Sequence, residues 1–166
     1  MNTRTLAETP RKLIKSKNTE VYMKPEVYEF QEKKVIGVGN IGEPINPGEV
    51  WPILFSRIQE IHGRKNTPET LGVIKRNEHG YLAGIEVEQL IEIPEGMFSY
   101  VIPAGRYIGM THKGPLSKIG ETFHNLISWL ASNNYEQYDI VCFEVYDERF
   151  KGEDPESEFN SYIQIK

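Results

Sequence analysis

The sequence contains a single cysteine, Cys142, which excludes an internal disulfide framework and a cysteine-rich zinc site. No apolar run approaches the ~18 residues that a membrane-spanning helix needs. The basic N-terminal stretch MNTRTLAETPRK has no apolar segment behind it, so it does not have the pattern of a secretory signal. Together these absences predict a cytoplasmic protein with no membrane association.

Motifs of metal and nucleotide chemistry are missing as well. None of the four histidines is spaced as one of a pair of ligands on a helix or beside the cysteine, so no metal site is expected. Gly37, Gly39 and Gly42 spell G-x-G-x-x-G, but Pro44 and Pro47 delay the helix that would have to bind a pyrophosphate. The sequence therefore predicts no metal and no cofactor.

What is present fits one soluble globular domain. The chain has 166 residues and 19.1 kDa, with 39% apolar and 26% charged residues. The net charge of −5 argues against a general nucleic-acid binder, because neutralising phosphates requires clustered Lys and Arg. Acidic residues gather near the C-terminus, with six between positions 147 and 166.

Two helices and several strands follow from the apolar pattern. Asn46 and Pro47 predict the start of a first helix, with Gly63 as its C-cap. Ser117 predicts the cap of a second helix that ends at residues 133–134. Stretches rich in β-branched and aromatic residues predict strands over residues 27–39 (one or two strands), 71–75, 81–88, 97–102, 106–112, 140–146 and 161–166.

The two halves of the chain resemble each other. KVIGVGNIG at residues 34–42 aligns with RYIGMTHKG at residues 106–114, and each half continues with a helix and two strands. We interpret the chain as an α+β fold of duplicated β-α-β-β units with antiparallel sheets and two main helices. The units cover about 27–90 and 97–166, follow an arm over 1–26, and pack about a pseudo-twofold axis with a pocket at the seam.

Glu144 is the most informative single residue. It lies in the apolar segment IVCFEVY, where a carboxylate must be hydrogen-bonded, held neutral or directed into a cavity that accepts a cation. Alternation along a strand places Cys142 and Tyr146 on the same face as Glu144. The simpler alternative is a glutamate at a strand edge that faces solvent or a lysine.

Aromatic residues are the second signal, with 9 Tyr, 7 Phe and 2 Trp in the chain. Most are expected in the core, because aromatic side chains ordinarily fill cores. A buried carboxylate among aromatic faces nevertheless suits bulky organic cations. With Glu144, the candidate ligand-binding residues are Tyr146, Tyr107, Trp51, Tyr81, Trp129 and Phe143.

The chain resembles the GyrI-like small-molecule-binding family, which also occurs as the effector-binding domain of AraC-type and MerR-type multidrug-responsive transcription activators. The resemblance runs through residues 27–166 and rests on the segments KVIGVG, VWPILF, LGV, YLAGIEV, PEGM, IPAGRYIGMTHKGP, ISWL, NNY, FEVYDERF and SYIQIK. It implies a duplicated β-α-β-β fold with an aromatic pocket and an acidic pocket residue, at the position of Glu144. Residues 1–26 are too short for a helix-turn-helix segment, so direct DNA binding is not expected.

Three functions follow from the resemblance. The first is a stand-alone binding protein for lipophilic cationic or aromatic compounds, with Glu144 as counter-ion and no catalytic residue. The second is a hydrolase of cyclopropane-bearing DNA-alkylating compounds, in which Glu144 would act as general base. The third is an inhibitor-like protein whose partner is DNA gyrase or a regulator, motivated by the acidic C-terminal segment.

Overall fold

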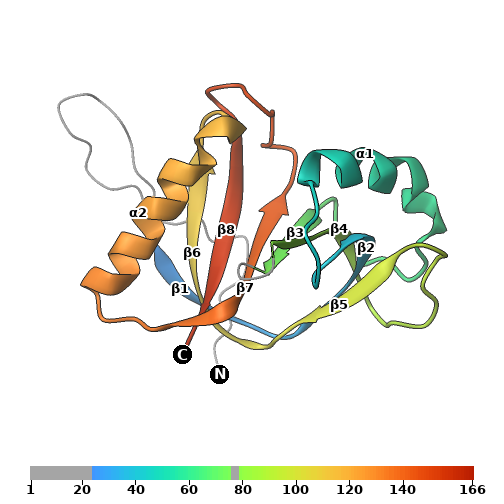
Figure 1. Ribbon diagram of the computed structural model, residues 1–166, viewed down its shortest axis with the longest axis horizontal. Helices are drawn as coiled ribbons and strands as arrows, with labels where there is room; N and C mark the ends of the chain where they lie inside the picture. The colour runs from blue at the N-terminus through green and yellow to red at the C-terminus, as the bar shows by residue number, and fades with distance from the viewer. Residues whose placement is uncertain (1–23, 76–78) are drawn as a thin grey trace.

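Residues 24–75 and 79–166 are described by the computed structural model shown in Figure 1. Most of the predicted N-terminal arm therefore lies outside the described residues. The described chain forms two helices, two short 3-10 helices and eight strands. Their bounds are β1 Glu26–Phe30, β2 Lys33–Asn40, α1 Pro47–Arg57, η1 Ile58–Glu60, β3 Thr70–Lys75, β4 Gly80–Val87, β5 Phe98–Ile102, β6 Gly105–Lys113, η3 Leu116–Lys118, α2 Ile119–Ser132, β7 Gln137–Tyr146 and β8 Glu158–Ile165.

The strands form one antiparallel sheet in the order β1-β6-β8-β7-β3-β4-β2-β5. This sheet must curl, because β1 lies at one edge and β2 next to the other, yet only residues 31–32 connect them. Three Cα-to-Cα steps span at most about 11 Å. Six strand spacings in a flat sheet would require about 29 Å. The predicted α+β class with antiparallel strands and two helices is confirmed.

One face of the curled sheet encloses an aromatic core to which neither helix contributes. The cluster contains side chains from all eight strands, and Phe30 of β1 lies 5.7 Å from the ring of Phe143 on β7. Its largest members are fully or almost fully buried: Tyr28, Tyr107, Phe143 and Tyr162. We call this cluster the inner core. The sheet closes over it without a covering helix because it curls.

The other face carries both helices, each over its own apolar cluster. Val50 and Leu54 of α1 pack on β2 and β4, and Leu126 and Leu130 of α2 pack on β6, β7 and β8. Figure 1 shows α2 and α1 at opposite ends of the molecule, with β7 and β3 between them. The central strands are therefore left without a helix directly above them.

The helix boundaries confirm part of the local prediction. The Asn46 side chain accepts a hydrogen bond from the Gly48 amide and caps α1, with Pro47 in the first turn. The Gly63 C-cap was wrong, because α1 ends at Arg57 and the chain tightens into η1. Ser117 was wrong as the cap of α2: it lies within η3, and its amide and hydroxyl both donate to Glu153.

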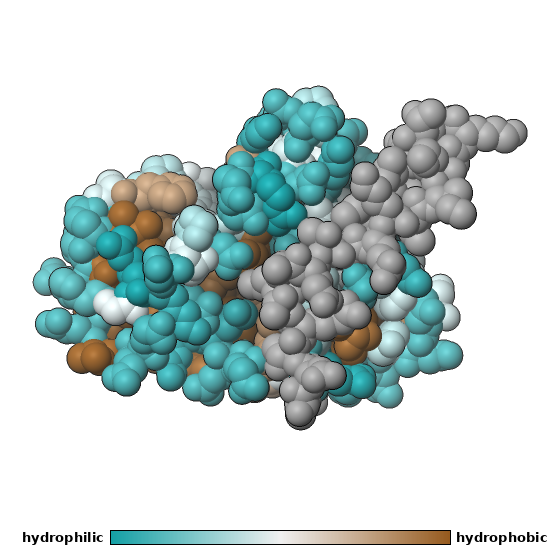
Figure 2. Space-filling model, turned by 180° about the vertical axis from the view of Figure 1, so that it is seen from behind, coloured by the Kyte–Doolittle hydropathy of each residue, from teal (hydrophilic) through white to brown (hydrophobic). Residues whose placement is uncertain are grey.

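Large exposed apolar side chains are unevenly distributed over the described residues. Nearly all belong to α1, to β5 or to the loop before β5, and Leu116 of η3 is the exception: Ile53, Phe55, Ile91, Ile93, Phe98, Val101 and Leu116. The view from behind in Figure 2 shows patches of apolar surface on the side that carries α1 and β5. Exposed apolar surface is thus concentrated at the end of the sheet that carries α1 and β5.

Candidate functional site

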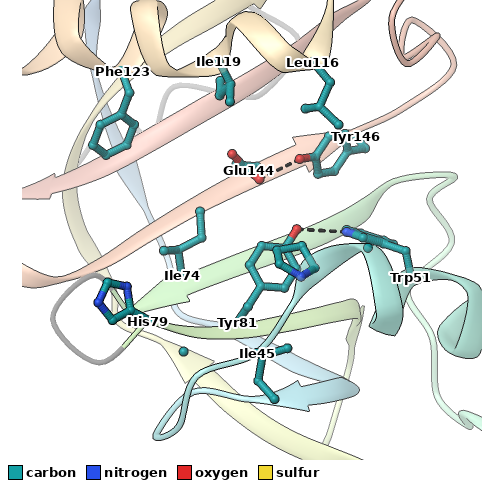
Figure 3. Close-up of a pocket in the computed structure, with 13 residues that line it drawn as sticks. Ile45, Trp51, Ile74, His79, Tyr81, Leu116, Ile119, Phe123, Glu144 and Tyr146 are labelled. Atoms are coloured by element: carbon teal, nitrogen blue, oxygen red, sulfur yellow. Dashed lines mark hydrogen bonds between the residues drawn. The ribbon is translucent and has the colours of Figure 1, made fainter.

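A pocket of about 680 Å³ lies on the helix-bearing face, between α1 and α2. This volume falls in the range of sites for drug-sized molecules. The lining residues come from the central strands β7, β3 and β4, from both helices, and from η3 and the loops before α1 and β4. Most are apolar or aromatic (Figure 3): Ile45, Pro47, Gly48, Trp51, Ile74, His79, Gly80, Tyr81, Leu116, Ile119, Phe123, Glu144 and Tyr146.

Strand β7 supplies the polar centre of the pocket. Successive side chains of a strand point to opposite faces, so Phe143 and Val145 enter the inner core while Glu144 and Tyr146 line the pocket. The Tyr146 hydroxyl donates a hydrogen bond of 2.6 Å to Oε1 of Glu144. Figure 3 shows this contact near the middle of the pocket.

A second hydrogen bond joins α1 to β4. The indole Nε1 of Trp51 donates to the Tyr81 hydroxyl at 3.0 Å. The Trp51 ring also meets Tyr146 edge to face, with 5.4 Å between ring centroids and an interplanar angle of 80°. Three aromatic side chains from three elements are thus held in fixed orientations around Glu144.

Glu144 is buried, with 8% of its surface exposed. Burial raises the pKa of its carboxyl to about 7, although the hydrogen bond from Tyr146 lowers it. Within residues 24–75 and 79–166, no Lys, Arg or His forms an ion pair with this carboxyl. The carboxyl therefore changes between its neutral and charged forms near pH 7, and its charged form can take a cationic partner from outside the chain.

The hydroxyls of the neighbouring tyrosines remain protonated. Burial raises the pKa of the Tyr146 hydroxyl, and the charge of Glu144 raises it further. Burial and the charge of Glu144 also raise the pKa of Tyr81, although its hydrogen bond with Trp51 acts in the opposite direction. Among Glu144, Tyr146 and Tyr81, only Glu144 therefore changes charge near neutral pH.

Gly72 makes room for this arrangement. It pairs with Glu144 across β3 and β7, and a Cβ atom at Gly72 would collide with the Tyr81 hydroxyl. The same Cβ would lie 3.2 Å from Oε1 of Glu144. Sequence reasoning missed this residue, although a glycine inside the strand segment TLGVIK is a signal for a close approach of neighbouring groups.

The structure brings together four of the seven candidate ligand-binding residues: Trp51, Tyr81, Glu144 and Tyr146. Tyr107 and Phe143 do not line this pocket, because their positions in β6 and β7 turn them into the inner core. Trp129 lies near the end of α2 and stacks on Tyr135, with 5.6 Å between ring centroids.

Several lining residues were not singled out from the sequence. Ile119 and Phe123 recur at helical spacing near the start of α2, and this apolar spacing could have indicated a pocket wall as well as core. Ile74 lies between the α1 and α2 clusters. His79, at positive φ before β4, and Ile45, in the loop before α1, had no sequence signal for a role in binding.

The described residues contain no group of three or more His, Cys, Asp or Glu side chains placed to hold a metal ion. In the same part of the chain, neither helix has both the length and the apolar character required to cross a bilayer.

The chain is similar to known proteins over its whole described length. The family model described as GyrI-like small molecule binding domain matches residues 23–166. The chain is 33% identical over 170 residues to the transcriptional regulator BrlR of Pseudomonas aeruginosa. That match covers 98% of this chain and 63% of BrlR, so the chain spans less than two thirds of this relative.

Solved structures share the fold at low sequence identity. SAV2435 bound to tetraphenylphosphonium aligns with a TM-score of 0.65 and 11% identity, over 87% of this chain and 94% of SAV2435. A hydrolase encoded by lin2189 from Listeria innocua aligns with a TM-score of 0.56 and 12% identity, over 86% of this chain and 92% of the hydrolase. The family match extends over nearly every described residue and over both walls of the pocket, and this chain therefore belongs to the GyrI-like small-molecule-binding family.

Proposed function

We propose that this protein binds lipophilic cationic or aromatic compounds in the pocket between α1 and α2, with Glu144 as counter-ion. The single observation that carries the proposal is a buried carboxyl without an ion-pair partner among the described residues, surrounded by aromatic side chains. A buried charge is costly unless it is paired, so a cationic ligand supplies what the chain does not.

The aromatic walls complement the carboxyl. Trp51, Tyr81 and Tyr146 present rings at different angles around one space, which suits ligands of varied shape. Each contact between a cation and an aromatic face contributes about 0.5–2 kcal/mol. The tetraphenylphosphonium in the SAV2435 structure is a bulky aromatic cation of this kind and supports the choice of a probe.

Binding of a cation is expected to depend on pH. Because burial raises the pKa of Glu144 to about 7, the carboxyl is mostly protonated below that pH. A cation binds best to the carboxylate and must displace the proton first. The affinity should therefore rise roughly tenfold per pH unit up to about 7 and level off above it.

The test compares a cation with a neutral compound of similar shape. Methyltriphenylphosphonium and triphenylphosphine oxide are titrated at about pH 8 into the wild type, Glu144→Gln and the matched surface variant Glu92→Gln. The lost attraction between two charges roughly 5–6 Å apart, about 3 kcal/mol at an effective dielectric constant of about 20, should weaken cation binding roughly 100-fold in Glu144→Gln.

The controls separate charge from shape. The neutral oxide should bind Glu144→Gln at least as tightly as the wild type, because it has no positive charge to lose and its phosphoryl oxygen can accept a hydrogen bond from the amide that replaces the carboxylate. Glu92 is exposed, so Glu92→Gln removes the same charge without touching the pocket. Equal cation affinity in Glu144→Gln and the wild type would contradict the role of Glu144 as counter-ion.

A hydrolytic activity is the second candidate, favoured by one observation. A carboxyl whose pKa is raised to about 7 beside a tyrosine hydroxyl has the properties of a general base that works near neutral pH. The likeness to the lin2189 hydrolase gives further support. The decisive measurement is mass spectrometry of a cyclopropane-bearing alkylator: a product equal in mass to substrate plus water, absent with Glu144→Gln, would establish turnover.

Three broader inferences accompany the proposal. The order β7-β8-β6 mirrors β3-β4-β2 about the central β3–β7 pair, which supports a duplicated β-α-β-β unit with a pseudo-twofold axis. Similarity to a protein named a transcriptional regulator supports a cytoplasmic location, and a regulator as partner stays a prediction. A gyrase partner stays a prediction from the acidic segment at residues 147–166, and a supercoiling assay tests it.

A further inference from the structure

Helix α1 carries two apolar stripes instead of one. The first is the buried stripe of Val50 and Leu54, which packs on β2 and β4. The second consists of residues at positions i, i+3, i+4 and i+7, which share one face of a helix: Gly48, Trp51, Pro52 and Phe55. A helix on a protein surface needs only the first stripe to fold, so the second calls for its own explanation.

The second stripe begins inside the pocket and ends in solvent. Gly48 and Trp51 line the pocket. One turn farther along the helix, Phe55 stacks on Trp51 with 5.7 Å between ring centroids and 27° between ring planes. Phe55 is nevertheless 56% exposed. A single exposed phenylalanine is ordinary, but a continuous apolar path from a binding pocket to the surface is not.

The mouth of the pocket also has an exposed apolar residue on the α2 side. Leu116 of η3 lines the pocket and is 37% exposed. Figure 3 shows Leu116 and Trp51 on either side of Tyr146. An occupant that reaches Glu144 and extends past Tyr146 therefore meets apolar surface on its way out.

Resting on the proposed function, we propose that the ligands of this pocket are amphiphilic cations with an apolar tail. The charged head lies at Glu144, and the tail leaves the pocket over Trp51 and lies on the ring of Phe55. A compact cation would occupy only the inner part of the site and leave the second stripe of α1 uncovered. The residue that distinguishes long from short ligands is thus Phe55.

The experiment uses two probes with the same head group, methyltriphenylphosphonium and decyltriphenylphosphonium, both below the concentration at which they form micelles. Their affinities are measured for the wild type, Phe55→Ala and Ile53→Ala. Ile53 is the matched control, because it is also an exposed apolar residue of α1 (44%) but lies off the second stripe. Both side chains are exposed, so neither variant should unfold the protein.

The decyl compound should bind the wild type at least roughly tenfold more tightly than the methyl compound, since a fully buried methylene contributes up to about fourfold in affinity. Phe55→Ala should reduce this ratio at least about threefold while methyl affinity stays within about twofold, and Ile53→Ala should change neither. Equal affinities for the two compounds, or an equal loss in both variants, would overturn the tail site and leave the proposed function standing. Failure of both compounds to bind would remove the proposed function itself and the tail site with it.

Discussion

Both faces of the sheet carry clustered aromatic side chains, but on one face these side chains fill a core and on the other they surround a cavity. The inner core packs tyrosine and phenylalanine rings with no helix over them, and its largest residues are fully or almost fully buried. On the other face, aromatic rings around Glu144 leave a cavity of about 680 Å³. The difference lies in curvature, because the concave face closes on itself while the convex face carries two helices with a gap between them. Aromatic content alone therefore does not distinguish a core from a binding site.

Strand β7 offers the sharpest test of this contrast, since Phe143 and Glu144 are neighbours on opposite faces. Phe143→Ala removes a fully buried ring from the inner core and should destabilise the fold by about 3–5 kcal/mol. Ligand affinity of the molecules that remain folded should change little, because Phe143 does not line the pocket. Urea denaturation and methyltriphenylphosphonium titration measure the two effects separately. A large loss of affinity in folded protein would refute the separation of the two faces.

Glu144→Gln should have the opposite effect on stability. The pKa of Glu144 is raised from 4.5 to about 7 in the folded state, so its contribution to stability is fully present below about pH 4.5 and is lost as the pH rises to about 7. The neutral glutamine avoids this loss. The variant should therefore match the wild type at about pH 4 and exceed its stability by up to roughly 3 kcal/mol at about pH 8.

Denaturant melts of both proteins across this pH range check the prediction, with Glu92→Gln as the control for net charge. A stability difference that does not change between the acidic and the neutral end would show that Glu144 titrates normally in the fold. A binding site often lowers the stability of the protein that carries it. A gain in stability on removing the Glu144 charge is therefore the behaviour expected of a residue selected for binding.

The contrast between the inner core and the pocket also explains which parts of the fold and of the site can be predicted from the sequence. Local patterns predicted the strands and the apolar faces of both helices, because these depend on near neighbours in the chain. The unusual carboxylate at Glu144 also stood out within its strand. Tyr107 and Phe143 could not be assigned to a face, because alternation orders the side chains without indicating which side of a curled sheet is enclosed. Pocket residues such as Ile74 and His79 depend on pairings between distant segments and carry no local signal.

Gly72→Ala tests how tightly the pocket is built. The added methyl group would meet the Tyr81 hydroxyl and approach Glu144, so these side chains must move. We expect a destabilisation of about 1–3 kcal/mol from overpacking, together with weaker binding of methyltriphenylphosphonium. Gly120→Ala is the matched control, because a Cβ there meets nothing within 4 Å and alanine favours the helix. Unchanged affinity in Gly72→Ala would mean that the Tyr81 hydroxyl has no part in binding.

The smallest expected effects come from deleting one hydroxyl on each face. The Tyr107 hydroxyl donates to the Pro103 carbonyl at 2.7 Å, and Tyr107→Phe should cost about 0.5–1.5 kcal/mol of stability without altering ligand binding. The Tyr146 hydroxyl donates instead to Glu144 and lowers its pKa against the effect of burial. Tyr146→Phe should therefore move the pH midpoint of cation binding to a higher value, while Tyr107→Phe leaves it unchanged.

Titrations of methyltriphenylphosphonium between about pH 5 and pH 9 measure this midpoint. Because the two substitutions remove the same atom, a shift that occurs only in Tyr146→Phe must come from the carboxyl that it contacts, and equal shifts would mean that the two faces of the sheet are electrostatically coupled.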